Sequence, residues 1–144
     1  MAAESTSCSC PGFIGATLGG GLTRWSGIYG LISDALDSVR LVSADGRLLN
    51  VSNTSYPDLF WGLRGAGQNF GIVTSATYKL HSPDPITQGK IVSVDFVFPA
   101  ANVPAYFKAL SAYSRSMPAK MAAISLVTFN STANAVSLRS YSPS

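Results

Sequence analysis

The stretch that decides the fold runs from Ser38 to Val51 and reads SVRLVSADGRLLNV. Val39 and Leu41 are two residues apart, which is the period of a strand with one buried face. Ala44-Asp45-Gly46 then supplies a tight turn, and apolar residues return directly after it. The pattern predicts a β-hairpin.

A short helix is predicted after the hairpin. Ser55 is expected to be its N-cap, Pro57 lies in the first turn, and Gly65 is expected to end it. Phe60 and Trp61 are expected to pack the helix onto the sheet.

A long strand is predicted next, from Gly71 to Leu80. Alternation predicts that one face of it carries Ile72, Thr74, Ala76 and Tyr78. The prolines of Pro83-Asp84-Pro85 then mark a domain boundary, with residues 1–82 before it and 83–144 after it. A strand (Ile91 to Phe98), a helix (Val103 to Ser116) and two further strands (Ile124 to Phe129 and Ala135 to Tyr141) are predicted beyond the boundary. This order predicts an α+β fold with an antiparallel sheet.

Glycines dominate the segment before the hairpin, which reads GATLGGG from Gly15 to Gly21. Three consecutive glycines cost backbone entropy, so a bare backbone should be needed there. One reason is close approach of amide N–H groups to a pyrophosphate or another anion. A flexible loop or tight turn is the alternative, and the residues alone leave both open.

Two familiar nucleotide-binding motifs are absent. No G-x-x-x-x-G-K-[ST] sequence occurs, so a P-loop is excluded. The run from Gly65 to Gly71 misses G-x-G-x-x-G by one position and follows a predicted helix instead of a strand. A Rossmann-type dehydrogenase is therefore disfavoured.

Composition and charge exclude further classes of protein. Charged residues make up 12% and hydrophobic residues 47% of the chain, so little of its surface is charged. The ten basic residues are scattered, and no nucleic-acid partner is expected. No apolar run is long enough to span a membrane. Cys8 and Cys10, with His81 far along the chain, do not form a metal site.

Two motifs in order carry a resemblance to a known family. The first is GATLGGGLTRWSGIYGLISDALDSVRLVSADGRLL (15–49), and the second is PDLFWGLRGAGQNFGIVTSATYKL (57–80). Together they resemble the second half of the FAD-binding PCMH-type domain of berberine-bridge-enzyme-like oxidases, the group that includes vanillyl-alcohol oxidase relatives, and especially its fungal members. The match runs from about Cys8 to Leu80. It implies that residues 1–82 are the C-terminal part of that domain and that residues 83–144 begin an antiparallel α+β substrate domain, in an incomplete piece of such an oxidase.

The resemblance also implies a set of cofactor-binding residues. They are Cys8, Gly15, Gly19, Gly20, Gly21, Tyr29, Gly30, Asp34, Gly71, Ile72 and Val73. In some relatives a cysteine is bonded to the flavin, and an ungapped comparison puts Cys8 on that position. Cys10, which precedes Pro11 as in the family, would need a two-residue gap. An ordinary small thiol is the alternative for Cys8.

The activity implied by the resemblance is that of an FAD-dependent oxidase. Hydride would pass from an alcohol, sugar or amine-type substrate to the flavin, and O2 would reoxidise it. No catalytic base is identified, and the substrate and oligomeric state stay open. The N-terminus is not a signal peptide, although the sequons at Asn50, Asn53 and Asn130 favour a secreted, glycosylated parent. The alternative is an inactive α+β remnant or a binding module without catalysis.

Overall fold

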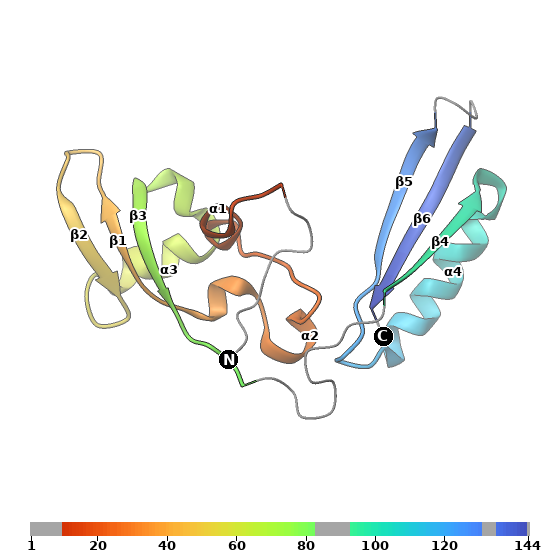
Figure 1. Ribbon diagram of the computed structural model, residues 1–144, viewed down its shortest axis with the longest axis horizontal. Coiled ribbons are helices and arrows are strands. Elements are labelled where there is room, and N and C mark those ends of the chain that lie inside the picture. The colour runs from red at the N-terminus through yellow and green to blue at the C-terminus, as the bar shows by residue number, and fades with distance from the viewer. Residues whose placement is uncertain (1–9, 83–92, 131–134, 144) are drawn as a thin grey trace. The chain divides into compact units, whose positions relative to one another are not determined.

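The computed structural model describes residues 10–82, 93–130 and 135–143 of the chain (Figure 1). It divides the chain into two compact units, Met1–Gly89 and Lys90–Ser144. Both units combine helices with antiparallel strands, so the predicted α+β fold is confirmed. The boundary predicted at residues 82 and 83 lies where the described part of the first unit ends, and the identity of the two units as domains stays a prediction.

A three-stranded antiparallel sheet forms the centre of the first unit. Its strands are β1 (Leu36–Val42), β2 (Leu48–Ser52) and β3 (Ile72–Tyr78), in the order β2-β1-β3. In the hairpin, Val39 pairs with Val51. The predicted β-hairpin is therefore confirmed.

The core of the first unit lies between this sheet and two helices, α1 (Phe13–Leu18) and α3 (Pro57–Ala66). Leu18, Leu36, Val39, Leu41, Val51, Phe60 and Leu63 form its buried cluster. Phe60 is fully buried, as expected, but Trp61 is 75% exposed, so the expectation that it packs onto the sheet is wrong. Adjacent helix residues point about 100° apart, which lets one enter the core while the next faces outward.

Both predicted ends of α3 are corrected. The N-cap is Tyr56, in a left-handed conformation at φ 55°, and not Ser55. The Ser55 hydroxyl donates instead to the Asn50 carbonyl, 2.9 Å away, and helps to close the turn after β2. Gly65 does not end the helix, which continues to Ala66 past an irregular Arg64 and into a 3₁₀ turn, η2 (Gly67–Asn69).

The side chains of β3 do not alternate as predicted. Arg40 pairs with Ser75 but Leu41 pairs with Val73, so an irregularity lies at Thr74. A bulge of this kind shifts the alternation by one residue. Val73 therefore packs against the core with Ala76 and Tyr78, while Ile72 and Thr74 are exposed.

Two short helices connect α1 to the sheet, namely α2 (Ser26–Tyr29) and the 3₁₀ helix η1 (Ile32–Asp34). α1 itself is tied to the sheet by a hydrogen bond between the Thr17 hydroxyl and the Tyr78 hydroxyl, 2.9 Å apart. The Thr17 hydroxyl donates to the Phe13 carbonyl, also 2.9 Å away, so Tyr78 is the donor of the first bond. Phe13 also packs edge-on against the Tyr78 ring.

This contact predicts an alkaline loss of stability. Burial raises the pKa of Tyr78 above its ordinary value of 10.0, although its hydrogen bond with Thr17 opposes the shift. The unfolded chain therefore ionises first, so the stabilising contribution is complete below pH 10 and is lost as pH rises through the folded-state pKa. We expect Tyr78→Phe to lose less stability than the wild type between pH 8 and pH 11, measured by urea unfolding. Tyr56→Phe, at an exposed position, is the control, and equal losses in all three proteins would contradict the prediction.

The second unit contains β4 (Ser93–Pro99), β5 (Ile124–Asn130) and β6 (Ala135–Pro143), in the antiparallel order β4-β6-β5. The helix α4 (Val103–Tyr113) packs on one face, where the rings of Tyr106 and Phe98 lie 5.5 Å apart. Two 3₁₀ turns, η3 (Ala100–Asn102) and η4 (Ser114–Ser116), flank α4, so the regular helix ends three residues before the predicted Ser116. Residues 91 and 92, where the first strand was predicted to begin, lie outside the described residues.

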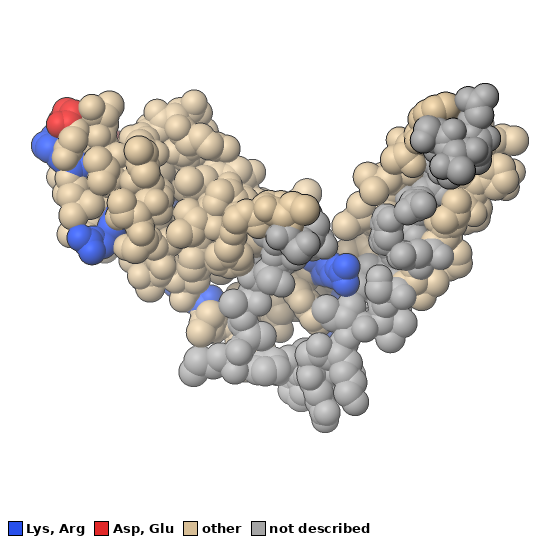
Figure 2. Space-filling model, turned by 45° about the horizontal axis from the view of Figure 1, so that its top comes forward, with Lys and Arg blue, Asp and Glu red and all other residues tan. Residues whose placement is uncertain are grey.

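The surface carries few charges. On the face drawn in Figure 2, most of the described surface belongs to residues that are neither acidic nor basic. Within the described ranges, none of the helices has the length and apolar character needed to cross a membrane.

Candidate functional site

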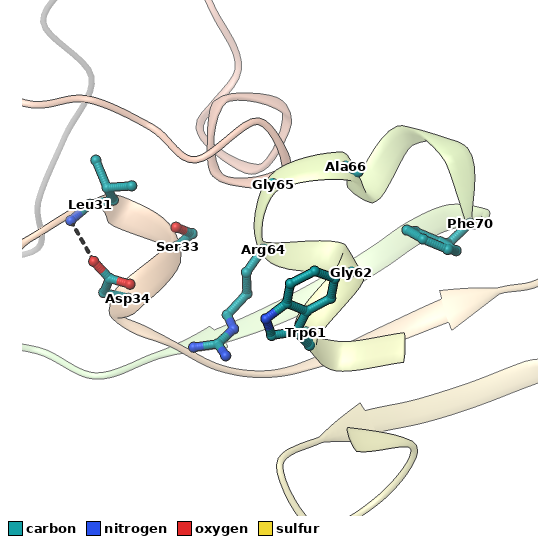
Figure 3. Close-up of a pocket in the computed structure, with 9 residues that line it drawn as sticks. All are labelled: Leu31, Ser33, Asp34, Trp61, Gly62, Arg64, Gly65, Ala66 and Phe70. Atoms are coloured by element: carbon teal, nitrogen blue, oxygen red, sulfur yellow. Dashed lines mark hydrogen bonds between the residues drawn. The ribbon is translucent and has the colours of Figure 1, made fainter. Parts of the chain in front are cut away.

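A cavity of about 450 Å³ lies beside α3 in the first unit (Figure 3). Its walls are Leu31, Ser33 and Asp34 on one side, Trp61, Gly62, Arg64, Gly65 and Ala66 of α3 on the other, and Phe70 after η2. Segments that are about thirty residues apart in sequence therefore meet there. Asp34 is the one predicted cofactor-binding residue among these walls.

The Asp34 carboxylate caps the backbone of its own segment. Its Oδ2 accepts a hydrogen bond of 2.8 Å from the Leu31 N–H, as drawn in Figure 3. Gly30, at φ 85°, allows this turn: a Cβ on Gly30 would lie only 2.6 Å from the same oxygen. The bare backbone at Gly30 therefore serves the capping carboxylate.

Arg64 is the cation of the cavity. Its guanidinium carbon lies 5.2 Å from the centre of the Phe60 ring. Its Nε is buried and has no hydrogen-bond partner among the residues that the structure describes. No ion pair joins Arg64 to Asp34. The cavity thus has on its walls a hydrogen-bonded carboxylate and a guanidinium that forms no ion pair within the described part of the chain.

The glycine segment lies directly beside η1. The carbonyls of Gly20 and Gly21 accept hydrogen bonds from the Ser33 and Ile32 N–H groups, at 3.0 and 2.9 Å. The amides of Gly19 and Gly20 donate to the Ala16 and Thr17 carbonyls and close the end of α1. At Gly21, φ is 75° and a Cβ would lie 2.8 Å from the Ile32 side chain. Local packing accounts for much of the bare backbone in this segment.

Gly71, Ile72 and Val73 lie at the start of β3 and do not line the cavity. Gly71 has a φ of 145°, and a Cβ there would overlap the Val42 carbonyl oxygen. Ile72 is 72% exposed, and Val73 packs against the core. The predicted strand segment therefore meets the cavity only through its neighbour in sequence, Phe70.

The remaining predicted residues lie apart from the cavity walls. Tyr29 stacks on His81, with ring centroids 4.3 Å apart. Gly15 is exposed on α1 with open space around it. Cys8 lies outside the described residues. The assignment of these residues to a cofactor stays a prediction.

Sequence reasoning missed Trp61, Arg64 and Phe70 as members of one cavity. Trp61 was expected to be buried, and the position of Arg64 depends on an irregular turn of α3. The motif PDLFWGLRGAGQNF contains all three, but only its folding around α3 and η2 brings them together. Within the ranges that the structure describes, no group of three or more histidine, cysteine, aspartate and glutamate side chains is placed to hold a metal ion.

Comparison of the sequence with curated proteins finds relatives that are described as FAD-linked oxidoreductases. An FAD-linked oxidoreductase of Aspergillus ruber is 52% identical over 130 residues, which are 90% of this chain and 26% of the relative. One from Pyricularia oryzae is 50% identical over 126 residues, 87% of this chain and 24% of the relative. The chain spans about a quarter of the length of these relatives. No protein-family model matches it.

Solved structures agree with these relatives. The 6-hydroxy-D-nicotine oxidase of Arthrobacter nicotinovorans matches 99% of this chain and 31% of its own, with a TM-score of 0.79 and 26% identity. The berberine-bridge-enzyme-like protein 1 of Physcomitrella patens matches 98% of this chain and 29% of its own, with a TM-score of 0.79 and 26% identity. A xylooligosaccharide oxidase from Myceliophthora thermophila shares 32% identity over 96% of this chain and 29% of its own, at a TM-score of 0.70.

In fold and sequence the chain is thus similar to a segment of FAD-linked oxidoreductases. The chain is a homologue of part of the FAD-linked oxidoreductases of the berberine-bridge-enzyme-like group, and the resemblance seen in its two motifs is confirmed.

Proposed function

We propose that this chain supplies part of the FAD-binding domain, and the beginning of the substrate domain, of an FAD-linked oxidase. The observation that carries the proposal is its 52% identity to an FAD-linked oxidoreductase over 130 residues. In this proposal a small molecule of the alcohol, sugar or amine type gives up a hydride to FAD, and O2 is the final electron acceptor. The residues of this chain bind and orient the cofactor.

The first unit fits such a role in part. Gly15 leaves room at its Cα atom, because no atom would lie within 4 Å of a Cβ there, whereas Gly20 is buried and a Cβ there would contact the Leu31 side chain. The exposed Ile72, and Leu22 at 78% exposure, offer apolar surface of the kind that a flavin or adenine ring covers. At Gly21 and Gly71, the space that a Cβ would need is already filled by the protein's own atoms. We therefore propose Gly15 and Ile72 as the strongest members of the predicted cofactor set.

Cofactor binding by the 144-residue chain alone is expected to be weak. Most of the polypeptide with which the relatives could enclose a dinucleotide has no counterpart here, because the chain spans about a quarter of their length. Enclosure from water is what makes such a site tight. We expect no flavin to remain with the chain after gel filtration, measured by absorbance near 450 nm. A stoichiometric yellow protein would contradict this expectation.

A chimera tests the proposed function itself. Residues 10–82 would replace the matching segment in the Aspergillus ruber relative. We expect the hybrid to be purified with bound FAD and to consume O2 with any substrate that the parent oxidises. A folded hybrid that lacks flavin would refute the proposal, since the segment would then be unable to serve a flavin site.

The second candidate is a remnant or binding module without catalysis. The chimera separates the two functions, because a segment that has lost its cofactor contacts should not restore flavin binding. We also propose a secreted, glycosylated parent, since the sequon residues Asn50 and Asn53 are both exposed; a mass shift on glycosidase treatment would test it.

A further inference from the structure

We propose that the cavity beside α3 is a binding subsite for a phosphate group, with Arg64 as its cationic ligand. Among the residues predicted to bind FAD, only Asp34 lines this cavity. The proposal therefore goes beyond the flavin assignment and can be tested with ligands that contain no flavin.

The first argument is the unpaired state of Arg64. Among the described residues, its guanidinium makes no hydrogen bond and no ion pair, and its buried Nε–H has no acceptor. Buried donors are nearly always satisfied in folded proteins, so an acceptor is expected at this site. The planar guanidinium presents several donors in the geometry that matches phosphate oxygens.

The second argument is that the carboxylate on the opposite wall does not neutralise Arg64. Asp34 Oδ2 is held by the Leu31 N–H at 2.8 Å, in a turn that the absence of a Cβ at Gly30 allows. In Figure 3 the Arg64 side chain lies between η1 and Trp61, and no ion pair joins it to this capped carboxylate. The negative charge of Asp34 limits the strength of an anion site, so we expect affinity for inorganic phosphate on the order of millimolar.

The third argument is the shape of the remaining wall. Gly65 has no atom within 4 Å of where a Cβ would lie, so the floor next to Arg64 is open. The indole of Trp61 is 75% exposed and lies beside the guanidinium. An exposed aromatic face next to a cation can hold a planar ring that carries a phosphate. A nucleotide should therefore bind more tightly than free phosphate.

The experiment uses the full chain labelled with 15N, in which the indole N–H signals of Trp25 and Trp61 are assigned by Trp61→Phe. Inorganic phosphate, ADP and chloride are titrated at constant ionic strength. We expect phosphate and ADP to shift the Trp61 signal and leave Trp25 unchanged, with ADP binding roughly tenfold more tightly. Chloride should have no such effect. Equal affinities for phosphate and ADP would identify the ligand as a free oxyanion, with the phosphate subsite retained.

Arg64→Gln should weaken both ligands by at least about tenfold, because it removes the charge at similar length. Arg47→Gln, which removes a charge from an exposed hairpin turn, should change them by less than about twofold. If Arg64→Gln does not fold, Arg64→Lys gives the comparison, since it keeps the charge but loses the planar fork and should bind more weakly than the wild type. The proposal fails if neither ligand shifts Trp61 in the wild type at about 20 mM, or if the folded Arg64 variant binds as the wild type does.

Discussion

Phe60→Ala is expected to unfold the first unit. Phe60 is fully buried in the cluster between α3 and the sheet, and truncation of a buried phenylalanine costs about 3–5 kcal/mol. Small domains have a total stability of about 5–15 kcal/mol, and this unit has few buried residues with which to compensate. We expect the cooperative transition in urea, followed by circular dichroism at 222 nm, to be shifted to very low urea or lost.

Trp61→Ala is the matched control, because it truncates the next residue of the same helix. Its side chain is 75% exposed, so the change in the free energy of unfolding should be within about 1 kcal/mol. If Phe60→Ala and Trp61→Ala were equally stable, the assignment of the core to this face of α3 would be wrong.

Phe60 and Trp61 also illustrate which features of the fold could be predicted from the sequence and which could not. The hairpin could be predicted because alternation and a turn signal agree from Ser38 to Val51. The buried face of α3 could not be assigned to Phe60 alone, because two adjacent aromatic residues look alike in composition. The side chains that share one face of β3 were predicted wrongly because of a bulge at Thr74. A run of small and β-branched residues does not indicate where a bulge will occur.

The candidate site was harder to predict than the fold. The glycine run drew attention as a ligand cradle, yet the bare backbone at Gly21 and Gly71 is needed by neighbouring protein atoms. The cavity instead depends on Arg64, whose backbone departs from helical geometry at φ −84° and ψ 26°. Local sequence patterns do not indicate that departure.

The second unit differs from the first in that many of its apolar side chains are exposed. Among the residues of this unit whose burial the structure describes, 94 and 96–129, none is buried, and large apolar side chains such as Phe129 and Val97 are exposed. The low proportion of charged residues in the sequence is consistent with this exposure of apolar side chains. Relatives about four times as long have further polypeptide that could serve this purpose, which agrees with the proposal that this unit begins a larger domain.

Gly71→Ala is expected to destabilise the first unit by at least about 3 kcal/mol. At φ 145° a side chain is strained, which costs about 1–3 kcal/mol, and the added Cβ would overlap the Val42 carbonyl oxygen. This overlap can be relieved only if β3 moves away from β1, the strand with which it pairs. Urea unfolding followed by tryptophan fluorescence measures the loss, since Trp25 and Trp61 both belong to this unit.

Gly65→Ala separates this effect from the loss of a glycine as such. An added Cβ there meets no atom within 4 Å, and alanine favours a helix over glycine by about 1 kcal/mol, so stability should be unchanged or slightly higher. Equal destabilisation by the two substitutions would show that the Val42 contact is not the cause. The same contrast helps to interpret flavin binding by the chimera. Loss of FAD in a Gly71→Ala chimera would follow from displacement of the strand. Loss of FAD in a stably folded Ile72→Asp chimera would instead indicate that Ile72 contacts the cofactor.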